Sequence, residues 1–346
     1  MRRPVRPTMC RCSMDGDRRS LLADMAGLCC RGDDDPAQAE SPYFLTLDKS
    51  PIKHRSYEAV LGSIAALHLR YVEGHGGEGL FVTGQSGSGK SFLVKTYAAM
   101  FPATDDCTGR CMPVLVAKAP PRPTVATMGA QLLKAIGVPR ARRGSKEWDE
   151  TDRLLYLINE LGVEIIILDE VNNLHDHAGQ SVLSEFTDWV KSLLDDTGLP
   201  VVLVGLPRST SIILQNMQLR RRFSGGVTLA PFARDSGASW REFRAVLKTL
   251  HRRTPLEAVQ YFDQLTARRF YYASAGLFDY LYKIINKAIE IAHPAGASIT
   301  VDTLAKGFVK GVWKDCPEDI NPFLTPPENL RLLTQPGEPF AGWDYS

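Results

Sequence analysis

Long apolar stretches are missing from this sequence of 346 residues. The longest apolar runs, such as residues 201–206, are far shorter than the roughly 20 residues that a membrane-spanning helix needs. The arginines near the N-terminus are not followed by the apolar segment of a secretory signal. We therefore expect a cytoplasmic protein with no membrane partner.

Paired cysteines with the spacing of a zinc site are also lacking. The seven cysteines form three local pairs, Cys10 with Cys12, Cys29 with Cys30, and Cys107 with Cys111, while Cys316 stands alone. A zinc ribbon needs two well-separated CxxC halves, which these spacings do not supply. The sequence favours reduced thiols, with a zinc site as the alternative.

A strong excess of one charge is the third feature that the chain lacks. Its formal net charge is +2, with 44% hydrophobic and 23% charged residues. This composition is typical of a soluble globular protein that can build one large core and a smaller module. Any contact with nucleic acid would have to come from local basic patches.

A glycine-rich segment is the most informative feature that is present. An apolar run at 79–83 precedes it, and a helical pattern at 92–100 follows it. The segment itself is Gly84, Gln85, Ser86, Gly87, Ser88, Gly89, Lys90 and Ser91. Strand, glycine loop and helix in this order form the Walker A motif, which binds the phosphates of a nucleoside triphosphate. Lys90 is predicted to neutralise phosphate charge and Ser91 to ligate Mg²⁺, whereas a plain glycine-rich turn is the disfavoured alternative.

A buried strand that ends in two acids is the second candidate site. Residues 163–168 are mostly aliphatic and lead directly into Asp169 and Glu170. A strand of this kind ends at the carboxyl edge of a parallel sheet. Asp169 is predicted to hold Mg²⁺, and Glu170 to orient and deprotonate the attacking water, so we expect ATP hydrolysis. An ordinary strand end with exposed acids is the alternative, and the glycine loop argues against it.

The remaining periodicity predicts an α/β fold with a parallel, doubly wound sheet. Further buried strands are expected at 112–117, 200–205 and 226–229, and Thr124 is expected to cap a helix that ends at Ile136. After Pro231 the pattern is helical, at 239–251, from Pro255, at 275–292 and at 300–313. Ser239 and Glu242 are expected to form the capping box of the first of these helices.

Four regions follow from this pattern: a poorly ordered N-terminal extension (1–45), a nucleotide-binding α/β domain (46–235), a small helical lid (236–315) and an extended C-terminal tail (316–346). The N-terminal extension is expected to be disordered or to form a short loose helix. The tail is rich in proline and acids and carries isolated aromatics such as Phe323, Phe340 and Trp343. These side chains could anchor a partner, or the tail could fold back on its own domain.

Three arginines, Arg220, Arg221 and Arg222, close the helix before the last strand. Cations at a helix C-terminus suit the macrodipole, which is the simpler interpretation. The favoured prediction is an arginine finger, Arg222 or Arg221, that reaches the γ-phosphate held by a neighbouring subunit.

Together these motifs resemble an AAA+ ATPase with a helical lid. The stretches GQSGSGKS, PPRPTVATMGAQLLKAIGVP, IIILDEVNNL, VVLVGLPRS, QLRRRF, SAGLFDYLYKIINKA and NPFL are similar to those of the TniB/TnsC-type ATPases, which regulate target choice in DNA transposition. The similarity covers roughly residues 50–325 and excludes the N-terminal extension.

The resemblance implies an ATP- and Mg²⁺-dependent bacterial protein that oligomerises on double-stranded DNA as a ring or a helical filament. It would mark a target site and recruit a transposase together with a target-selection protein, and hydrolysis would release the assembly. The residues implied to contact DNA lie in two loops: Lys118 and Arg122 in the first, and Arg140, Arg142, Arg143 and Lys146 in the second. Cations on adaptable loops suit phosphate contacts with little sequence preference, although solvated loop charges are the alternative.

Two departures from the AAA+ pattern bear on the expected rate. Leu206 stands where a polar sensor residue usually follows the fourth strand, with Arg208 and Ser209 as the nearest polar candidates. Tyr280 occupies about the place of the usual lid arginine. Both favour a slow ATPase, stimulated by DNA or a partner, that acts as a timed switch. The competing hypotheses are a helicase or clamp loader of the same superfamily and a nucleotide-binding signalling scaffold.

Overall fold

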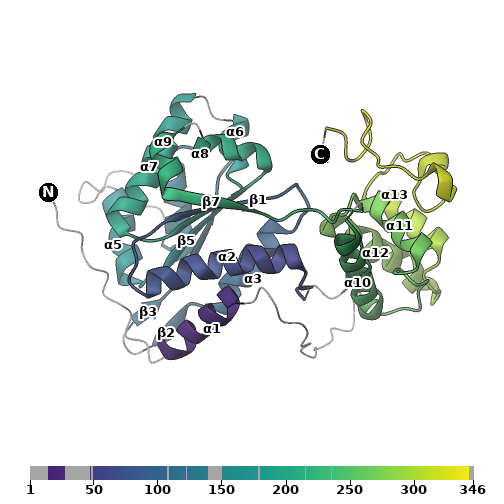
Figure 1. The fold of residues 1–346 in the computed structure, drawn as a ribbon, viewed down its shortest axis with the longest axis horizontal. Coiled ribbons are helices and arrows are strands. Elements are labelled where there is room, and N and C mark those ends of the chain that lie inside the picture. The colour runs from purple at the N-terminus through teal and green to yellow at the C-terminus, as the bar shows by residue number, and fades with distance from the viewer. Residues whose placement is uncertain are drawn as a thin grey trace. The chain divides into compact units, whose positions relative to one another are not determined.

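The computed structural model describes residues 15–27, 47, 50–106, 109–121, 123–138, 150–177, 180–214, 216–234 and 236–342. These residues form two compact units (Figure 1). The first is built mainly from Arg55–Ser86 and Lys90–Leu229, and the second mainly from the chain after Ala230. No helix in these ranges is both long and apolar enough to cross a bilayer.

A five-stranded parallel sheet forms the centre of the first unit. Its strands are β1 (Gly79–Thr83), β4 (Val114–Lys118), β5 (Ile165–Asp169), β6 (Val201–Gly205) and β7 (Phe223–Thr228). They lie in the order β4-β5-β6-β1-β7, and each neighbouring pair is parallel. Every residue of β5 and β6 is buried, as expected for aliphatic strands covered on both faces. The predicted parallel α/β sheet is confirmed.

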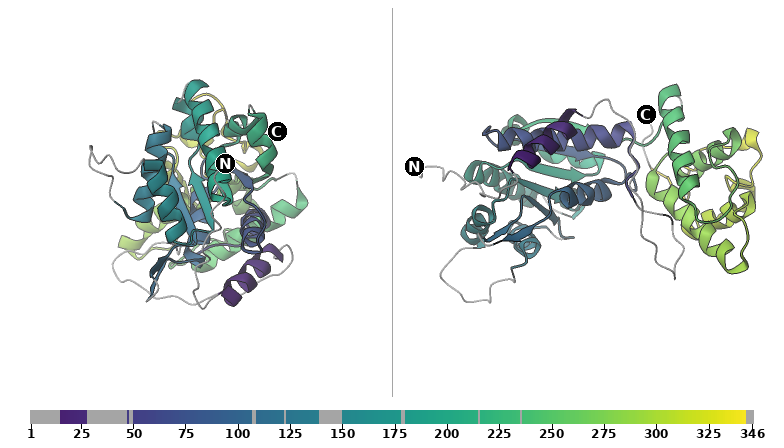
Figure 2. Two further views of the ribbon diagram at one scale, coloured as in Figure 1. Left: turned by 90° about the vertical axis from the view of Figure 1, so that its left-hand side faces the viewer. Right: turned by 90° about the horizontal axis from the view of Figure 1, so that it is seen from below.

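Side chains alternate between two cores, one on each face of the sheet. From β5, Ile166 and Leu168 belong to the core built with α4 (Val125–Ile136), α5 (Glu150–Glu160) and α7 (Gln180–Thr197). Ile165 and Ile167 belong to the opposite core, with α2 (Arg55–Val72) and α3 (Lys90–Met100). Figure 2 shows helices on both sides of the strands, which is the doubly wound arrangement.

Local signals explain how individual helices begin and end. Thr124 is the N-cap of α4, and its side chain and that of Thr127 exchange hydrogen bonds with each other's backbone N–H in a capping box. Gly137 ends α4 with a φ of 88°, the left-handed conformation that glycine adopts without strain. The predicted cap at Thr124 is confirmed.

Several short elements were not predicted. An antiparallel hairpin, β2 (Thr104–Asp106) with β3 (Gly109–Cys111), lies between α3 and β4. The others are α6 (Asn172–His177), the 3₁₀ turn η2 (Pro207–Ser209) and α8 (Thr210–Leu214), whereas α9 (Met217–Arg222) is the arginine-rich helix expected before the last strand. Each of the unpredicted elements is too short for a periodic pattern to reveal it.

The structure shows a helix in the N-terminal extension, one of the two alternatives expected for this segment. Asp15–Gly27 form α1, which packs on α2 through the buried Leu22 and Met25. Gly62 of α2 permits the close approach, because a Cβ there would lie 3.2 Å from the Met25 carbonyl oxygen. Arg18 adds an ion pair with Glu164 at 3.5 Å. The extension is thus tied to the first unit by tertiary contacts that its sequence pattern does not show.

The second unit is helical. It contains α10 (Gly237–Arg253), α11 (Gln264–Ser274), α12 (Phe278–Ala292), the turn η3 (His293–Ala295) and α13 (Val301–Gly311). Two predictions are wrong here. The N-cap of α10 is Ser236, whose side chain accepts from Ser239 N–H, so Ser239 does not open the helix. The segment from Pro255 to Asp263 forms bends, a parallel bridge between Ala258 and Ile299 and a turn, and the next helix begins only at Gln264.

The C-terminal segment folds back onto the second unit. It includes the 3₁₀ turns η4 (Glu318–Ile320) and η5 (Pro327–Asn329). Phe323 and Phe340 are buried in the unit's core, at 1% and 0% exposure. Their rings meet Phe270 and Tyr280, each at a centroid distance of 5.2 Å. Of the two alternatives for the tail aromatics, the structure shows folding back for both phenylalanines, while Trp343 lies outside the described residues.

Candidate nucleotide-binding site

The glycine loop connects β1 to α3 at the carboxyl edge of the sheet. Gly87 and Gly89 have φ angles of 80° and 97°, which L side chains rarely adopt. A Cβ at Gly89 would meet no atom within 4 Å, so backbone conformation rather than space requires glycine there. The loop therefore depends on its glycines for the shape that a phosphate cradle needs.

Lys90 begins α3, and its ammonium folds back over the loop. Nζ donates hydrogen bonds to the carbonyl oxygens of Gly84 at 2.7 Å and Gln85 at 2.8 Å. Burial lowers the pKa of Lys90 to about 8, against the opposing effect of the negative charges of Asp169 and Glu170. The structure therefore brings the loop lysine within electrostatic reach of both predicted acids.

The loop residues fit a nucleoside triphosphate. The buried hydroxyl of Ser88 has no hydrogen-bond partner within the described residues, and the Lys90 ammonium bonds to loop carbonyls. Both are groups that phosphate oxygens could satisfy. In the same described part of the chain, no three His, Cys, Asp or Glu side chains form a ready metal cage. Mg²⁺ needs none, because it commonly binds one or two protein oxygens together with phosphates and water, and Ser91 and Asp169 could supply them.

Asp169 and Glu170 end β5 in different environments. Asp169 is 3% exposed, and its Oδ1 accepts a hydrogen bond from Glu170 N–H at 2.8 Å. Glu170 has a φ of 60°, and such a left-handed conformation costs a non-glycine residue roughly 1–2 kcal/mol. Hydrogen bonds on both sides of it, from Ala119 N–H to the Asp169 carbonyl and from Val171 N–H to the Val204 carbonyl, hold this turn in place. Backbone strain of this kind collects at functional sites.

The carboxylate of Glu170 is held by Lys118. The ion pair joins Lys118 Nζ to Glu170 Oε1 at 2.6 Å, and this hydrogen bond raises the pKa of Lys118. It arises because β4 and β5 are neighbours and Lys118 is paired in register with Asp169. Lys118 was predicted to contact DNA, and its bond to the predicted base was not foreseen. Arg122, Arg140, Arg142, Arg143 and Lys146, the other predicted DNA contacts, lie outside the described residues.

The three arginines of α9 are exposed, while Leu219 and Phe223 on either side of them are buried. Arg222 forms an ion pair with Asp195 of α7 in the same subunit. To act on a neighbour's nucleotide, Arg222 would have to leave this partner. Arg221 makes no ion pair with any residue that the structure describes. The arginine finger stays a prediction, and the geometry favours neither Arg221 nor Arg222 for that role.

Ser209 is the polar side chain that the structure places beside the end of β6. It is fully buried at the last position of η2, and its hydroxyl finds no hydrogen-bond partner in the described ranges. A Cβ added at Gly205 would lie 3.2 Å from Ser209 Oγ, so the two residues pack closely. Leu206 follows β6, as the sequence requires, and Arg208 is exposed. Ser209 is therefore the better candidate for a polar sensor.

Tyr280 takes part in the packing of the second unit. Its ring meets Phe340 edge-on, and Lys283 Nζ lies 5.1 Å from the ring centroid. An aromatic side chain in this role cannot replace the charge of an arginine.

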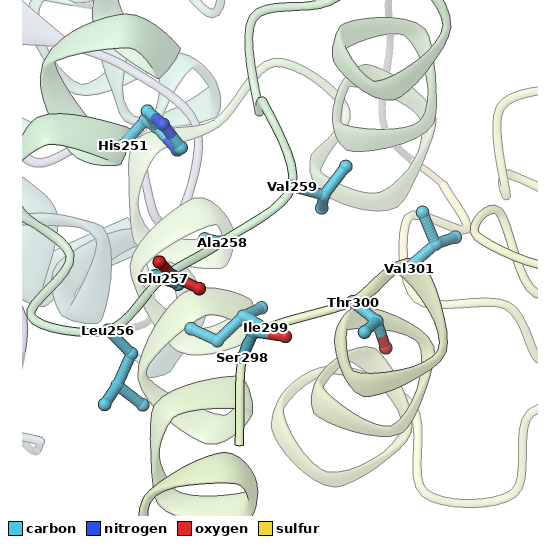
Figure 3. Close-up of a pocket in the computed structure, with 9 residues that line it drawn as sticks. All are labelled: His251, Leu256, Glu257, Ala258, Val259, Ser298, Ile299, Thr300 and Val301. Carbon is cyan, nitrogen blue, oxygen red and sulfur yellow. The ribbon is translucent and has the colours of Figure 1, made fainter. Parts of the chain in front are cut away.

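A separate pocket of about 700 Å³ lies within the second unit (Figure 3). It is lined by His251, Leu256, Glu257, Ala258, Val259, Ser298, Ile299, Thr300 and Val301. The Nδ1 of His251 is buried and has no partner in the described part of the chain. None of the predicted phosphate, metal or DNA residues lines this pocket.

Comparison with known proteins identifies the sequence family. The profile of the bacterial TniB protein matches residues 47–232, which include the glycine loop, both acids and the α9 arginines. No curated protein matches the chain.

Solved structures with a similar fold include ORC and Cdc6 proteins. The ORC2 protein of Aeropyrum pernix in its ADPNP–ADP complexes is 17% identical, with a TM-score of 0.55 over 78% of this chain and 72% of that chain. Cdc6p of Pyrobaculum aerophilum is 15% identical, with a TM-score of 0.55 over 81% and 72%. The ORC1 protein of Aeropyrum pernix in complex with DNA is 16% identical, with a TM-score of 0.52 over 75% and 66%. At such identities the likeness concerns the fold, and the chain has the AAA+ P-loop fold followed by a helical region. Because the TniB profile matches more than half of the sequence, the chain belongs to the bacterial TniB family.

Proposed function

We propose that this protein is an ATP-dependent DNA-binding regulator of DNA transposition. It oligomerises on double-stranded target DNA, marks the site for a transposase and a target-selection protein, and disassembles when ATP is hydrolysed. It acts on DNA in the bacterial cytoplasm. Membership of the TniB family supports the pathway, and the nucleotide complexes and the DNA complex among its structural neighbours support the ligands.

The observation that carries the proposal is the convergence of Lys90, Asp169 and Glu170 at the carboxyl edge of one sheet. The loop from Gly84 to Gly89 would cradle the phosphates, and Lys90 would give up its carbonyl partners to bind them. Ser91 and Asp169 would hold Mg²⁺, which neutralises phosphate charge when it is bound.

Glu170 would orient the attacking water and accept its proton. While Lys118 holds its carboxylate, Glu170 is less available for that task. The ion pair, together with Tyr280 in place of a lid arginine, supports slow hydrolysis that DNA or a partner could stimulate. Arg221 or Arg222 of a neighbouring subunit would complete the site.

DNA contact would come from Lys118 and from the cations at positions 122, 140, 142, 143 and 146. Side chains of this kind bind the phosphate backbone, so the affinity should depend on salt more than on sequence. A phosphate that captures Lys118 would also release Glu170, which links DNA binding to hydrolysis.

Gel filtration and electron micrographs of the full chain with a non-hydrolysable ATP analogue and duplex DNA test the proposal. We expect nucleotide-dependent rings or filaments on the duplex, and Lys90→Ala should abolish them. Lys95→Ala, an exposed lysine in the same helix, is the matched control and should assemble normally. A wild-type protein that stays monomeric with analogue and duplex would refute the proposal.

Two other functions keep distinct signatures. A helicase or clamp loader would unwind duplex or load a ring, and its gene would stand beside replication genes rather than a transposase gene. A nucleotide-binding scaffold would release no phosphate, with or without duplex.

A further inference from the structure

Every fully exposed charged side chain of α10 is a cation, and the one acid of this helix, Glu242, is half-buried. In the helix labelled α10 in Figure 1, Arg241, Lys248 and Arg252 are exposed. Their spacing of seven and four residues places them along one side of the helix. Phe243 and Leu250 on the opposite side are buried in the second unit's core. We call these three cations the α10 stripe.

Other exposed helix faces of the same unit are built differently. On α12, Lys283 pairs with Asp279 at 2.6 Å, and Lys287 pairs with Glu290 at 2.7 Å. On α13, Lys306 pairs with Asp302 at 2.7 Å. These lysines are neutralised within their own helix, which is the usual state of a solvated helix face.

The α10 stripe has no such neutralisation. Arg241, Lys248 and Arg252 form no ion pair with any carboxylate in the described ranges. Arg244 lies three residues after Arg241 and four before Lys248, and its Nε donates a hydrogen bond to the Phe262 carbonyl oxygen at 2.9 Å. Because this partner is uncharged, Arg244 adds a further positive charge to this part of the helix. Cations three and four residues apart repel one another on a helix surface. An external anion would relieve that repulsion.

A nucleic-acid duplex is the anion that this geometry fits. At a rise of about 1.5 Å per residue, the α10 stripe extends over roughly 16 Å. A duplex presents a phosphate charge about every 1.7 Å of its axis, so a straight row of cations finds partners at any sequence. Two aromatic rings lie beside the stripe. Lys248 Nζ lies 5.8 Å from the Phe262 ring centroid, and Trp240 is stacked on Phe243 at 5.6 Å and meets Tyr271 edge-on. Both rings are engaged within the unit, so they offer no free platform for the unpaired bases of a single strand.

We propose that the α10 stripe is a second phosphate-binding surface for double-stranded DNA, separate from the loop cations of the first unit. The inference rests on the proposed DNA-binding function and adds a surface that lies beyond the residues matched by the family profile. An acidic protein is the other kind of partner, but it would need carboxylates at matching positions, whereas a duplex supplies charge along its whole length.

The test compares two triple variants of the full chain that change the net charge equally. The first is Arg241→Gln/Lys248→Gln/Arg252→Gln. The second is Lys283→Gln/Lys287→Gln/Lys306→Gln, which removes three lysines that are already paired. Binding of a 30-base-pair duplex with ATP analogue is followed by fluorescence anisotropy over a range of salt concentrations. Thermal melts of both variants check folding. Five of the six side chains are exposed and Lys287 is half-buried, so the melting temperatures should stay close to wild type.

We expect the first variant to reduce the slope of log affinity against log salt by about 2.7, at roughly 0.9 per lost phosphate contact. Its affinity at physiological salt should fall by about tenfold or more, and the control variant should keep nearly the wild-type slope. Equal slopes in the two variants, with wild type still binding, would overturn the inference and leave the proposed function standing. Failure of the wild-type protein to bind duplex at all would refute the inference and the proposed function together.

Discussion

The two units of this protein use charge in opposite ways. In the first unit, buried strands deliver charged residues to one edge of the sheet, where Lys90, Lys118, Asp169 and Glu170 act on one another. In the second unit, an aromatic core holds helices whose charges lie on their outer faces. A substitution at the sheet edge should therefore change chemistry, and one in the aromatic core should change stability.

The largest expected effect tests the chemical side of this comparison. Glu170→Gln keeps the shape of the side chain but removes the base. Hydrolysis should fall by roughly 10²- to 10⁴-fold, while nucleotide binding stays near wild type because Glu170 is not a phosphate ligand. Phosphate release and nucleotide titration measure the two effects. Glu160→Gln, an exposed position on α5, is the control, and equal rates in both variants would exclude Glu170 as the base.

The second prediction tests the stability side. Phe340→Ala removes a fully buried ring that contacts Tyr280, and the loss should cost about 3–5 kcal/mol of stability. Hydrogen exchange of the α11 and α12 amides would report the loss within the second unit. Leu324→Ala, at a position 43% exposed, should cost far less. Similar protection in the two variants would mean that the tail does not stabilise this unit.

The sequence predicts the sheet and the glycine loop well because their signals are local. Four consecutive aliphatic residues before Asp169, and eight motif residues from Gly84 to Ser91, each lie within one short stretch. The pairing of Lys118 with Glu170 depends instead on β4 lying beside β5 in one register. No pattern within either strand carries that information, so the sequence revealed both residues without their contact.

The helical regions show a second limit of sequence reasoning. Ser236 and Ser239 are both good N-caps, and Ser239 also has Glu242 three residues later, so the wrong serine was favoured. The helix α1 buries few side chains, and its position depends on the α2 surface. Burial of Phe323 and Phe340 likewise depends on a core assembled from distant helices. The position of α1 and the burial of the two phenylalanines therefore depend on tertiary packing that no local pattern specifies.

The third prediction concerns the charge of Lys90. Its pKa of about 8 means that the free protein loses the ammonium proton as the pH rises through 8. Bound phosphate would raise this pKa, so nucleotide affinity should be highest below pH 8 and fall by about tenfold between pH 7 and pH 9. Calorimetry in buffers of different ionisation enthalpy should show proton uptake on binding at pH 8.5. In Lys90→Arg the guanidinium stays charged, and proton uptake should vanish. Uptake that persists in this variant would assign the proton to another group.

The smallest expected effect is on the rate of hydrolysis when the ion pair between Lys118 and Glu170 is removed. It tests whether the charges at the sheet edge control the chemistry there. Both side chains are about half exposed, and ion pairs of this kind are worth roughly 0.2–1 kcal/mol. Lys118→Ala should therefore raise DNA-free hydrolysis by up to about fivefold, because Glu170 is no longer held away from water. Lys118→Arg keeps the positive charge and should keep the low rate.

Steady-state phosphate release with and without duplex measures this restraint. In wild type, duplex DNA should raise the hydrolysis rate. In Lys118→Ala the stimulation by DNA should be smaller, because the ion pair that restrains Glu170 is already absent. Lys306→Ala breaks an exposed ion pair of the second unit and should change neither rate. A lower DNA-free rate in Lys118→Ala would mean that Lys118 supports Glu170 instead of restraining it. The sheet edge would then be a preassembled active site, and control of hydrolysis would have to come from a neighbouring subunit.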